Sequence, residues 1–265
     1  MSLRDYAILS KSLIFYENDV NDISLRESIF SSMNDGGRIL GWGPDEHTNV
    51  SIASSFGIDM IAADWSYNLS VLSSYPSIPM NQKTSKDMIQ EDGVHYVTFI
   101  MSDGDNQQWL LGSNYNTKDW FGSPYRGNFN LGWSLSPSLY YLAPTVFNKY
   151  YEAASSSKYN YDINNAYKGK IIWSNNKPII SCRDLLLGGI EDENQLLSNI
   201  DDRINLGYTN IKDANSYTFV YVHVWSNTMD NVNDVITKLN KNPKVRIVTP
   251  DTFVKLIQNN ISHTL

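Results

Sequence analysis

The chain has 265 residues, of which 42% are hydrophobic and 18% charged, and this length and composition fit one large or two small globular α/β domains. The net charge of −7 argues against nucleic acid as a partner, because phosphate binding depends on clustered Lys and Arg residues that the sequence lacks. No apolar run reaches the length of a membrane span, the N-terminus lacks a secretory signal pattern, and the single cysteine, Cys182, excludes an internal disulfide.

Helix-like and strand-like segments alternate through the first half of the chain. The spacing of apolar residues predicts, in order, helices at 3–16 and 24–33, a strand at 38–43, a helix at 48–56 and a strand at 59–65. A long loop at 66–93 precedes a strand at 96–101, a short helix at 107–111 and a second loop to residue 131. Ser136 as N-cap and Pro137 at the first helical position then predict one helix at 136–154.

The second half continues the same rhythm. The predicted strands are 169–174, 178–182, 217–225 and 245–248, and the predicted helices are 191–206, 230–239 and 250–261. Strands that alternate with helices pair in parallel through helical crossovers. We therefore predict an α/β protein with a β/α barrel over 37–265, preceded by a helical lead-in at 1–36; an open doubly wound sheet is the alternative. No glycine-rich dinucleotide motif follows the first strand, and no cofactor is predicted.

The segment from His95 to Trp109, HYVTFIMSDGDNQQW, is the most informative part of the sequence. An apolar strand ends in two carboxylates, Asp103 and Asp105, which repel each other unless a partner or a function retains them. If the backbone stays extended, both side chains project to the same side, and Gly104 allows a close approach to the main chain. In a second interpretation, Asp105 or Asn106 caps the following helix and Asp103 lies in a turn.

Active sites of β/α proteins lie at the carboxyl ends of the strands. The side chains that this rule gathers are Trp42, Asp45, Glu46, His47, Asp64, Trp65, Asp103, Asp105, Asn106, Arg183, Asp184, His223 and Trp225. Trp109 adds a further aromatic surface. For Arg126 and Arg183 two interpretations are open: they pair with the acidic residues of the site and keep them ionised, or they are ordinary surface residues. Carboxylates beside tryptophans suit cleavage of a glycosidic bond, which needs an acid, a base or nucleophile, and aromatic faces that hold the sugar.

Several blocks resemble one known family in matching order. SDGDNQQWLLG, GWSLSPSLYYLAPTVFNKYYEAA, GKIIWSNNKPIISCRDLLLGG and YTFVYVHVWSNTMDNV with VRIVTPDTFVKLI resemble the C-terminal domain of the GxGYxYP family of putative glycoside hydrolases. The first part of the chain resembles the domain-joining region of that family. The naming motif itself is absent. The resemblance implies a seven-stranded β/α barrel, a separate N-terminal domain that completes the cleft, and a secreted or cell-envelope location.

The resemblance also implies a catalytic set of one Glu and two Asp, which correspond here to Glu46, Asp103 and Asp105. Our mechanistic hypothesis assigns Glu46 as general acid and one Asp as the base that activates water, on a carbohydrate substrate. A carboxyl separation of about 6.5–9.5 Å would give inversion and about 5–5.5 Å retention. Alternatively, Glu46 is an exposed carboxylate in the first turn of a helix, where the helix dipole favours it.

Two further functions remain open at this point. Asp103, Asp105 and His223 are the residue types of a metal-dependent carbohydrate deacetylase, although a histidine within an apolar strand is more often a hydrogen-bonded core residue. The absent motif and the supply of tryptophans also fit a carbohydrate-binding module without turnover. Under the hydrolase hypothesis, the residues expected to bind substrate are Trp42, Asn106, Trp109, Arg126, Arg183, His223 and Trp225.

Overall fold

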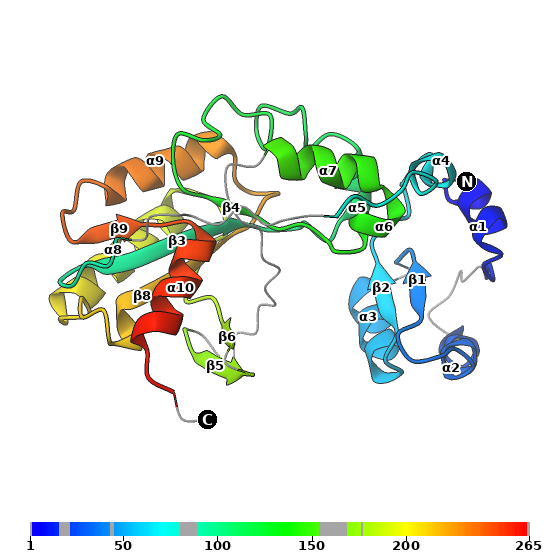
Figure 1. Cartoon of the computed structure of the whole chain (residues 1–265), viewed down its shortest axis with the longest axis horizontal. Coiled ribbons are helices and arrows are strands. Elements are labelled where there is room, and N and C mark those ends of the chain that lie inside the picture. Colours follow the sequence, from blue (N-terminus) through cyan, green and yellow to red (C-terminus); the bar gives the residue numbers. More distant parts are fainter. Residues whose placement is uncertain are drawn as a thin grey trace. The chain divides into compact units, whose positions relative to one another are not determined.

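The computed structural model describes residues 2–15, 22–42, 45–79, 89–153, 169–175 and 177–263. The chain divides into two compact units (Figure 1). Unit 1 comprises Met1–Pro79, Asp105–Ser113 and Ser136–Tyr151, and unit 2 comprises Met80–Gly104, Asn114–Leu135 and Glu152–Leu265. Among the described residues, no helix has the length and apolar character that crossing a membrane requires.

Unit 1 contains a two-stranded parallel sheet of β1 (Arg38–Leu40) and β2 (Asp59–Ile61), connected by α3 (Glu46–Ser55). Its other helices are α1 (Arg4–Ser10), α2 (Ile23–Ser31), α4 (Leu69–Leu72), α5 (Gln107–Leu111) and α6 (Leu139–Leu142), and α7 (Pro144–Ala153) begins in it. Two small apolar clusters stabilise the unit. One is centred on Phe30 and Ile58, and the other on Ile61 and Leu69.

The single helix predicted at 136–154 is wrong, because the structure has two helices there, α6 and α7. Ala143 separates them with φ −150° and ψ 69°, outside the helical region. The reason is Pro144, whose ring disfavours the helical conformation of the preceding residue and which cannot donate a backbone hydrogen bond. The proline therefore starts a new helix instead of lying within an old one.

Unit 2 contains a five-stranded sheet in which every pairing is parallel. Its strands are β3 (His95–Met101), β4 (Gly132–Trp133), β7 (Asp184–Leu186), β8 (Tyr217–Val222) and β9 (Val245–Ile247). The order is β4-β3-β8-β7, and β9 pairs with the first half of β3. All seven residues of β3 are buried, as expected for a parallel strand that is covered on both faces. Met101 pairs with Val222, so β3 and β8 end at the same edge of the sheet.

Three helices accompany this sheet: α8 (Ile190–Asn205), α9 (Met229–Leu239) and α10 (Pro250–Asn260). Their bounds lie within a residue or so of the predicted ones. Thr228 caps α9 in a capping box with Asn231, and Pro250 occupies the first turn of α10. Phe253, Leu256 and Ile257 of α10 belong to the main apolar cluster of the unit.

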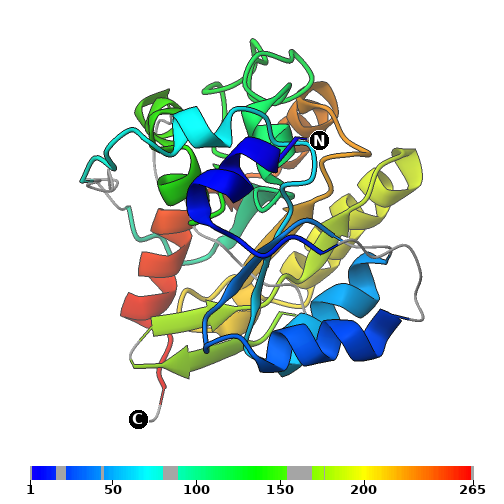
Figure 2. The ribbon, with the colours of Figure 1, turned by 90° about the vertical axis from the view of Figure 1, so that its right-hand side faces the viewer.

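The segments 169–174 and 178–182 do not join the parallel sheet. They form β5 (Ile171–Ser174) and β6 (Lys177–Ile180), an antiparallel hairpin that is a sheet of its own. Figure 2 shows these two strands side by side in yellow-green. No helix separates the two segments, and neighbouring strands joined by a short turn pair antiparallel. Parallel pairing throughout was thus a wrong expectation, and β7, the strand after this hairpin, was not predicted.

The α/β class is confirmed. The strands of the described residues form three sheets, and none of the three closes into a barrel.

Gly104 lies three residues after β3 and contacts Ser134, the residue that directly follows β4. Its N–H donates to Ser134 Oγ at 2.8 Å, and that hydroxyl donates to Met101 O at 2.7 Å. A Cβ at Gly104 would lie 2.0 Å from the carbonyl carbon and oxygen of Ser134. Gly104→Ala should therefore lower the free energy of unfolding by about 3 kcal/mol, because backbone atoms must shift to admit the methyl group.

Urea unfolding measures this loss. Gly127→Ala is the control, since its added methyl group meets open space and only the positive φ of 95° opposes it. Equal losses of stability in the two variants would contradict the close contact at Gly104.

Candidate active site

Asp103 lies just after the carboxyl end of β3 and has φ +62°, in the left-handed region. Aspartate tolerates this conformation better than most residues, and such strain concentrates at functional sites. Ser102 Oγ donates to Asp103 Oδ1 at 2.6 Å, and Trp225 Nε1 donates to Asp103 Oδ2. Ser102 Oγ itself accepts from the N–H of Val224 at 3.1 Å. Both carboxylate oxygens are thus held by donors from the segments that directly follow β3 and β8.

An aromatic surface adjoins this carboxylate within unit 2. Trp225 is 50% exposed, and its ring meets Trp120 edge to face, with ring centroids 5.9 Å apart and planes at 86°. Trp120 Nε1 donates to Val224 O at 3.2 Å, which fixes the second indole against the same turn. A half-buried carboxylate beside an exposed indole can hold a pyranose ring and act on its oxygen atoms.

The motif between Asp103 and Asn106 is not extended. The positive φ of Asp103 turns the chain directly after the strand, so the predicted alignment of two side chains on one extended strand is wrong. Asn106 instead caps α5, accepting from the N–H of Trp109 at 3.1 Å. Asp105 is exposed and belongs to unit 1. Trp109 is only 5% exposed, so it is a core residue of that unit.

Glu46 is an exposed residue in the first turn of α3. Asp45 caps that helix by accepting from the N–H of Thr48 at 2.7 Å, and these hydrogen bonds to Thr48 lower the pKa of Asp45. Trp42 is half-buried, and its N–H donates to Asp64 Oδ1 at 3.1 Å. Glu46, like Asp105, belongs to unit 1, whereas Asp103 belongs to unit 2.

Of the remaining predicted binding residues in unit 2, some lie at the sheet edge that carries Asp103 and others do not. His223 directly follows β8, and its Nδ1 lies 2.7 Å from Ser226 Oγ, at the same sheet edge as Asp103. Arg126 is exposed, donates to Ala153 O at 2.7 Å and lies over the ring of Phe121. Of the predicted residues, the structure therefore brings Asp103, His223 and Trp225 to one edge. Ser102 was not predicted, although a hydroxyl beside a strand-end carboxylate is a usable signal.

Arg183 directly precedes β7 and Asp184 is the first residue of that strand, so neither follows a strand of the five-stranded sheet. Arg183 Nη2 donates to Gly169 O at 3.0 Å and to Ala214 O at 3.4 Å, and burial lowers the pKa of its guanidinium. Asp184 is 3% exposed and forms an ion pair with Arg203, whose Nη2 lies 3.0 Å from Asp184 Oδ1. These contacts tie the hairpin and β7 to the rest of unit 2.

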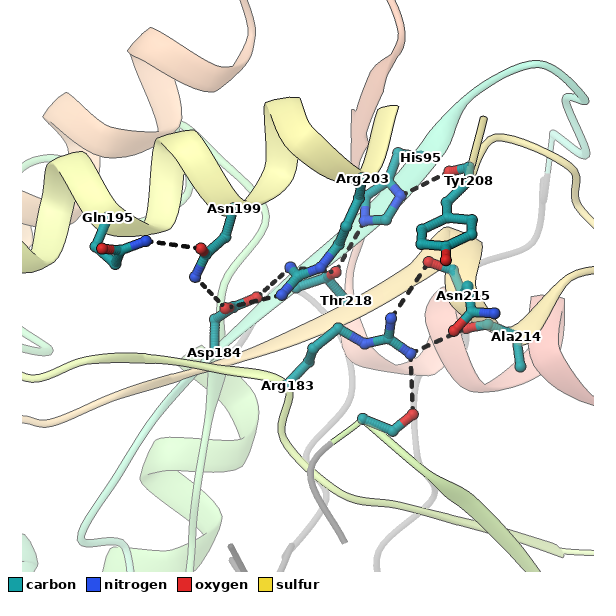
Figure 3. A network of polar contacts seen from close by, with 11 residues as sticks. His95, Arg183, Asp184, Gln195, Asn199, Arg203, Tyr208, Ala214, Asn215 and Thr218 are labelled. Carbon is teal, nitrogen blue, oxygen red and sulfur yellow. Dashed lines mark hydrogen bonds and ion pairs between the residues drawn. The ribbon is translucent and has the colours of Figure 1, made fainter. Parts of the chain in front are cut away.

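This ion pair extends into a buried network (Figure 3). Arg203 Nη1 donates to Thr218 Oγ1 at 3.2 Å, and His95 Nε2 lies 2.8 Å from the same hydroxyl. His95 Nδ1 lies 2.8 Å from Tyr208 O, which can only accept, so Nδ1 carries the proton and Nε2 accepts from Thr218. His95 is the first residue of β3, about 20 Å from its carboxyl end at about 3.3 Å per residue. The network is therefore a structural feature far from Asp103.

His95 makes the stability of the protein sensitive to acid. Burial, followed by the nearby charge of Arg203, lowers the pKa of His95 from 6.5 to about 4. A histidine whose pKa is lowered in the folded state binds a proton more readily in the unfolded state. Its contribution to the free energy of unfolding is therefore complete above pH 6.5 and is lost as the pH falls through 4. The expected loss in free energy of unfolding is about 3 kcal/mol.

Urea unfolding of the wild type and of His95→Gln at pH 7 and pH 4.5 tests this dependence. The difference in stability between the two proteins should shrink at pH 4.5, because the acid-sensitive contribution exists in the wild type alone. A difference that stays constant with pH would show that His95 does not titrate in this window.

The described part of the chain contains no group of three or more His, Cys, Asp or Glu side chains arranged to hold a metal ion. The ligand set of Asp103, Asp105 and His223 considered for a deacetylase therefore has no structural support.

Comparisons with known proteins place this geometry in context. The family model described as the GxGYxYP putative glycoside hydrolase C-terminal domain matches residues 93–163 and 157–258, and the GxGYxYP third domain matches residues 1–74. The chain is similar to a crystal structure of a putative hydrolase from Bacteroides thetaiotaomicron VPI-5482, with 28% identity and a TM-score of 0.81. The similarity covers 97% of this chain and 64% of that one, so this chain spans less than two thirds of its length. No curated protein matches.

Proposed function

This chain belongs to the GxGYxYP family, and from that membership we propose that it carries a glycoside hydrolase site in which Asp103 takes part in cleaving a glycosidic bond. The observation that carries the proposal is the position of Asp103 at the carboxyl end of β3, with one oxygen bonded to Ser102 and the other to the exposed Trp225. The family description and the hydrolase relative support the reaction class.

Asp103 suits the role of a proton acceptor. Both of its oxygens accept hydrogen bonds, whereas a general acid needs a proton directed at the leaving oxygen. In the proposed reaction, Asp103 takes a proton from water, the water oxygen bonds to the anomeric carbon, and the bond from that carbon to the leaving oxygen breaks. The leaving oxygen takes a proton from a carboxylic acid, a role that the family resemblance assigns to Glu46. Asp105 is the second aspartate of the proposed set.

Trp225 supplies the sugar-binding surface of this site. Its half-exposed indole lies beside the carboxylate that it hydrogen-bonds, so a pyranose ring stacked on it brings its anomeric carbon close to Asp103. His223 at the same edge is a proposed hydrogen-bond partner for sugar hydroxyls. The β/α barrel and the additional N-terminal domain implied by the family resemblance are also proposals for this chain.

The test is a screen of plant, fungal and host glycans with the wild-type chain, measuring binding and the release of reducing ends. We expect release from at least one glycan, and NMR of the first product then identifies inversion or retention. Glu46→Gln should lose that release. Binding without release, unaffected by Asp103→Asn, would instead identify a carbohydrate-binding module, and neither binding nor release would contradict the proposal.

A further inference from the structure

Two large aromatic side chains are exposed on the loop that follows β2 in unit 1. Trp65 is 66% exposed and Tyr67 is 63% exposed. Three neighbouring residues are buried: Ala63 and Ser66 have no exposed surface and Leu69 is 2% exposed. The loop is therefore packed against its unit while both aromatic side chains remain in solvent, at a free-energy cost that burial would have avoided.

The loop is held in place by the first turn of α5. Gln107 N donates to Ala62 O at 2.9 Å, and Gln108 Oε1 accepts from the N–H of Trp65 at 2.7 Å. A turn closes the loop where the N–H of Ser66 donates to Ala63 O at 3.0 Å. These bonds fix the backbone that carries both aromatic rings, so little conformational entropy is lost when a ligand stacks on them.

Asp64 of this loop and Gln107 of α5 each carry a buried acceptor atom. Asp64 Oδ1 accepts from the N–H of Trp42, but Asp64 Oδ2 is buried without a hydrogen-bond partner among the described residues. Within the same described ranges, Oε1 of Gln107, a residue with no exposed surface, also has no partner. Buried acceptors without donors are costly, and in native proteins such atoms mark strained or functional positions or hold an ordered water.

We infer that Trp65, Tyr67 and Asp64 form a saccharide-binding subsite on unit 1, which takes a neutral pyranose ring. The aromatic rings match the apolar face of the sugar. The carboxylate of Asp64 disfavours an anionic sugar, because like charges repel. This inference rests on the proposed function, but it concerns binding and uses residues other than Asp103.

The experiment measures the dissociation constant of the wild-type chain for the neutral hexasaccharide of the glycan that binds best in the screen. Trp65→Ala should raise this constant about five- to tenfold, Tyr67→Ala should raise it less, and Trp65→Phe should recover most of the affinity. Tyr75→Ala is the control, because Tyr75 is an aromatic residue of unit 1 that is 50% exposed and lies outside this loop. The three side chains replaced in these four variants are exposed, and circular dichroism verifies that the variants fold.

The outcomes separate this inference from the proposed function. A dissociation constant for Trp65→Ala within twofold of the wild-type value would overturn the subsite, even if Asp103→Asn abolishes hydrolysis. Equal losses in Trp65→Ala and Tyr75→Ala would also overturn it, since the effect would not be specific to the loop. A wild-type chain that binds none of the screened glycans contradicts both proposals together. Lost affinity in Trp65→Ala with kcat unchanged at saturation supports the subsite.

Discussion

Asp103→Asn should lower kcat for glycan hydrolysis by about 10²–10⁴-fold, because an amide cannot take a proton from water. The substitution preserves size, and the remaining carbonyl oxygen still accepts one hydrogen bond, from Ser102 or from Trp225. We therefore expect KM to change little. Initial rates of reducing-end release over a range of substrate concentrations separate the two constants.

The matched control is Asp202→Asn, which removes an exposed carboxylate from α8 in the same unit. Its activity should equal that of the wild type, which excludes a general effect of lost negative charge. Loss of a general base usually lowers kcat by at least about 10²-fold. If Asp103→Asn keeps more than about a tenth of the wild-type kcat, the loss is smaller than that, and Asp103 is not the proton acceptor of the reaction.

Asp184→Asn should lower the free energy of unfolding by about 3–5 kcal/mol, because it leaves the guanidinium of Arg203 without its buried counter-charge. The side chain of Asp184 is 3% exposed and that of Arg203 is 16% exposed, so water cannot replace the lost interaction. The carboxylate also accepts from Asn199 Nδ2 at 2.9 Å, and the same guanidinium orients Thr218 toward His95. Urea unfolding at pH 7 measures the loss.

Glu91→Gln is the control for this prediction, since it breaks an arginine–carboxylate pair of similar geometry at the surface. Arg246 Nη2 lies 2.6 Å from Glu91 Oε1, and both side chains are about 40% exposed. Exposed pairs contribute about 0–1 kcal/mol, so the control should lose far less stability than Asp184→Asn. Similar losses in the two variants would mean that burial does not determine the strength of these ion pairs.

The helices and main strands of unit 2 were predictable because their signals are local. The apolar run of β3, the apolar spacing of α8 to α10, and the capping signals at Thr228 and Pro250 all act over a few residues. The prediction of one helix at 136–154 failed although its local signal was present. Pro144 disfavours a helical conformation at the residue before it, and this rule was not applied to that helix. The hairpin of β5 and β6 also carried a local sign, because no helical segment separates its two strands.

The candidate site was predictable in part. Parallel pairing brings the carboxyl ends of β3 and β8 to one edge, which allowed Asp103, His223 and Trp225 to be expected together. Composition does not distinguish a buried tryptophan from an exposed one, and for this reason Trp109 was expected in the site and lies in the core. Asp184 was expected in the site for a similar reason. Its partner Arg203 lies 19 residues away on α8, so the sequence around Asp184 does not show that the carboxylate is buried in an ion pair.

The sequence by itself determined the α/β class, the family, and the position of two carboxylates at the end of a buried strand, since periodicity and motifs are properties of neighbouring residues. Only the tertiary structure decided which side chains meet Asp103. Its partner Trp225 is 122 residues away in the chain, and the two come together because six residue pairs align β3 with β8 in parallel register. Such contacts depend on strand pairing and helix packing across the whole unit, and no local pattern in the sequence encodes them.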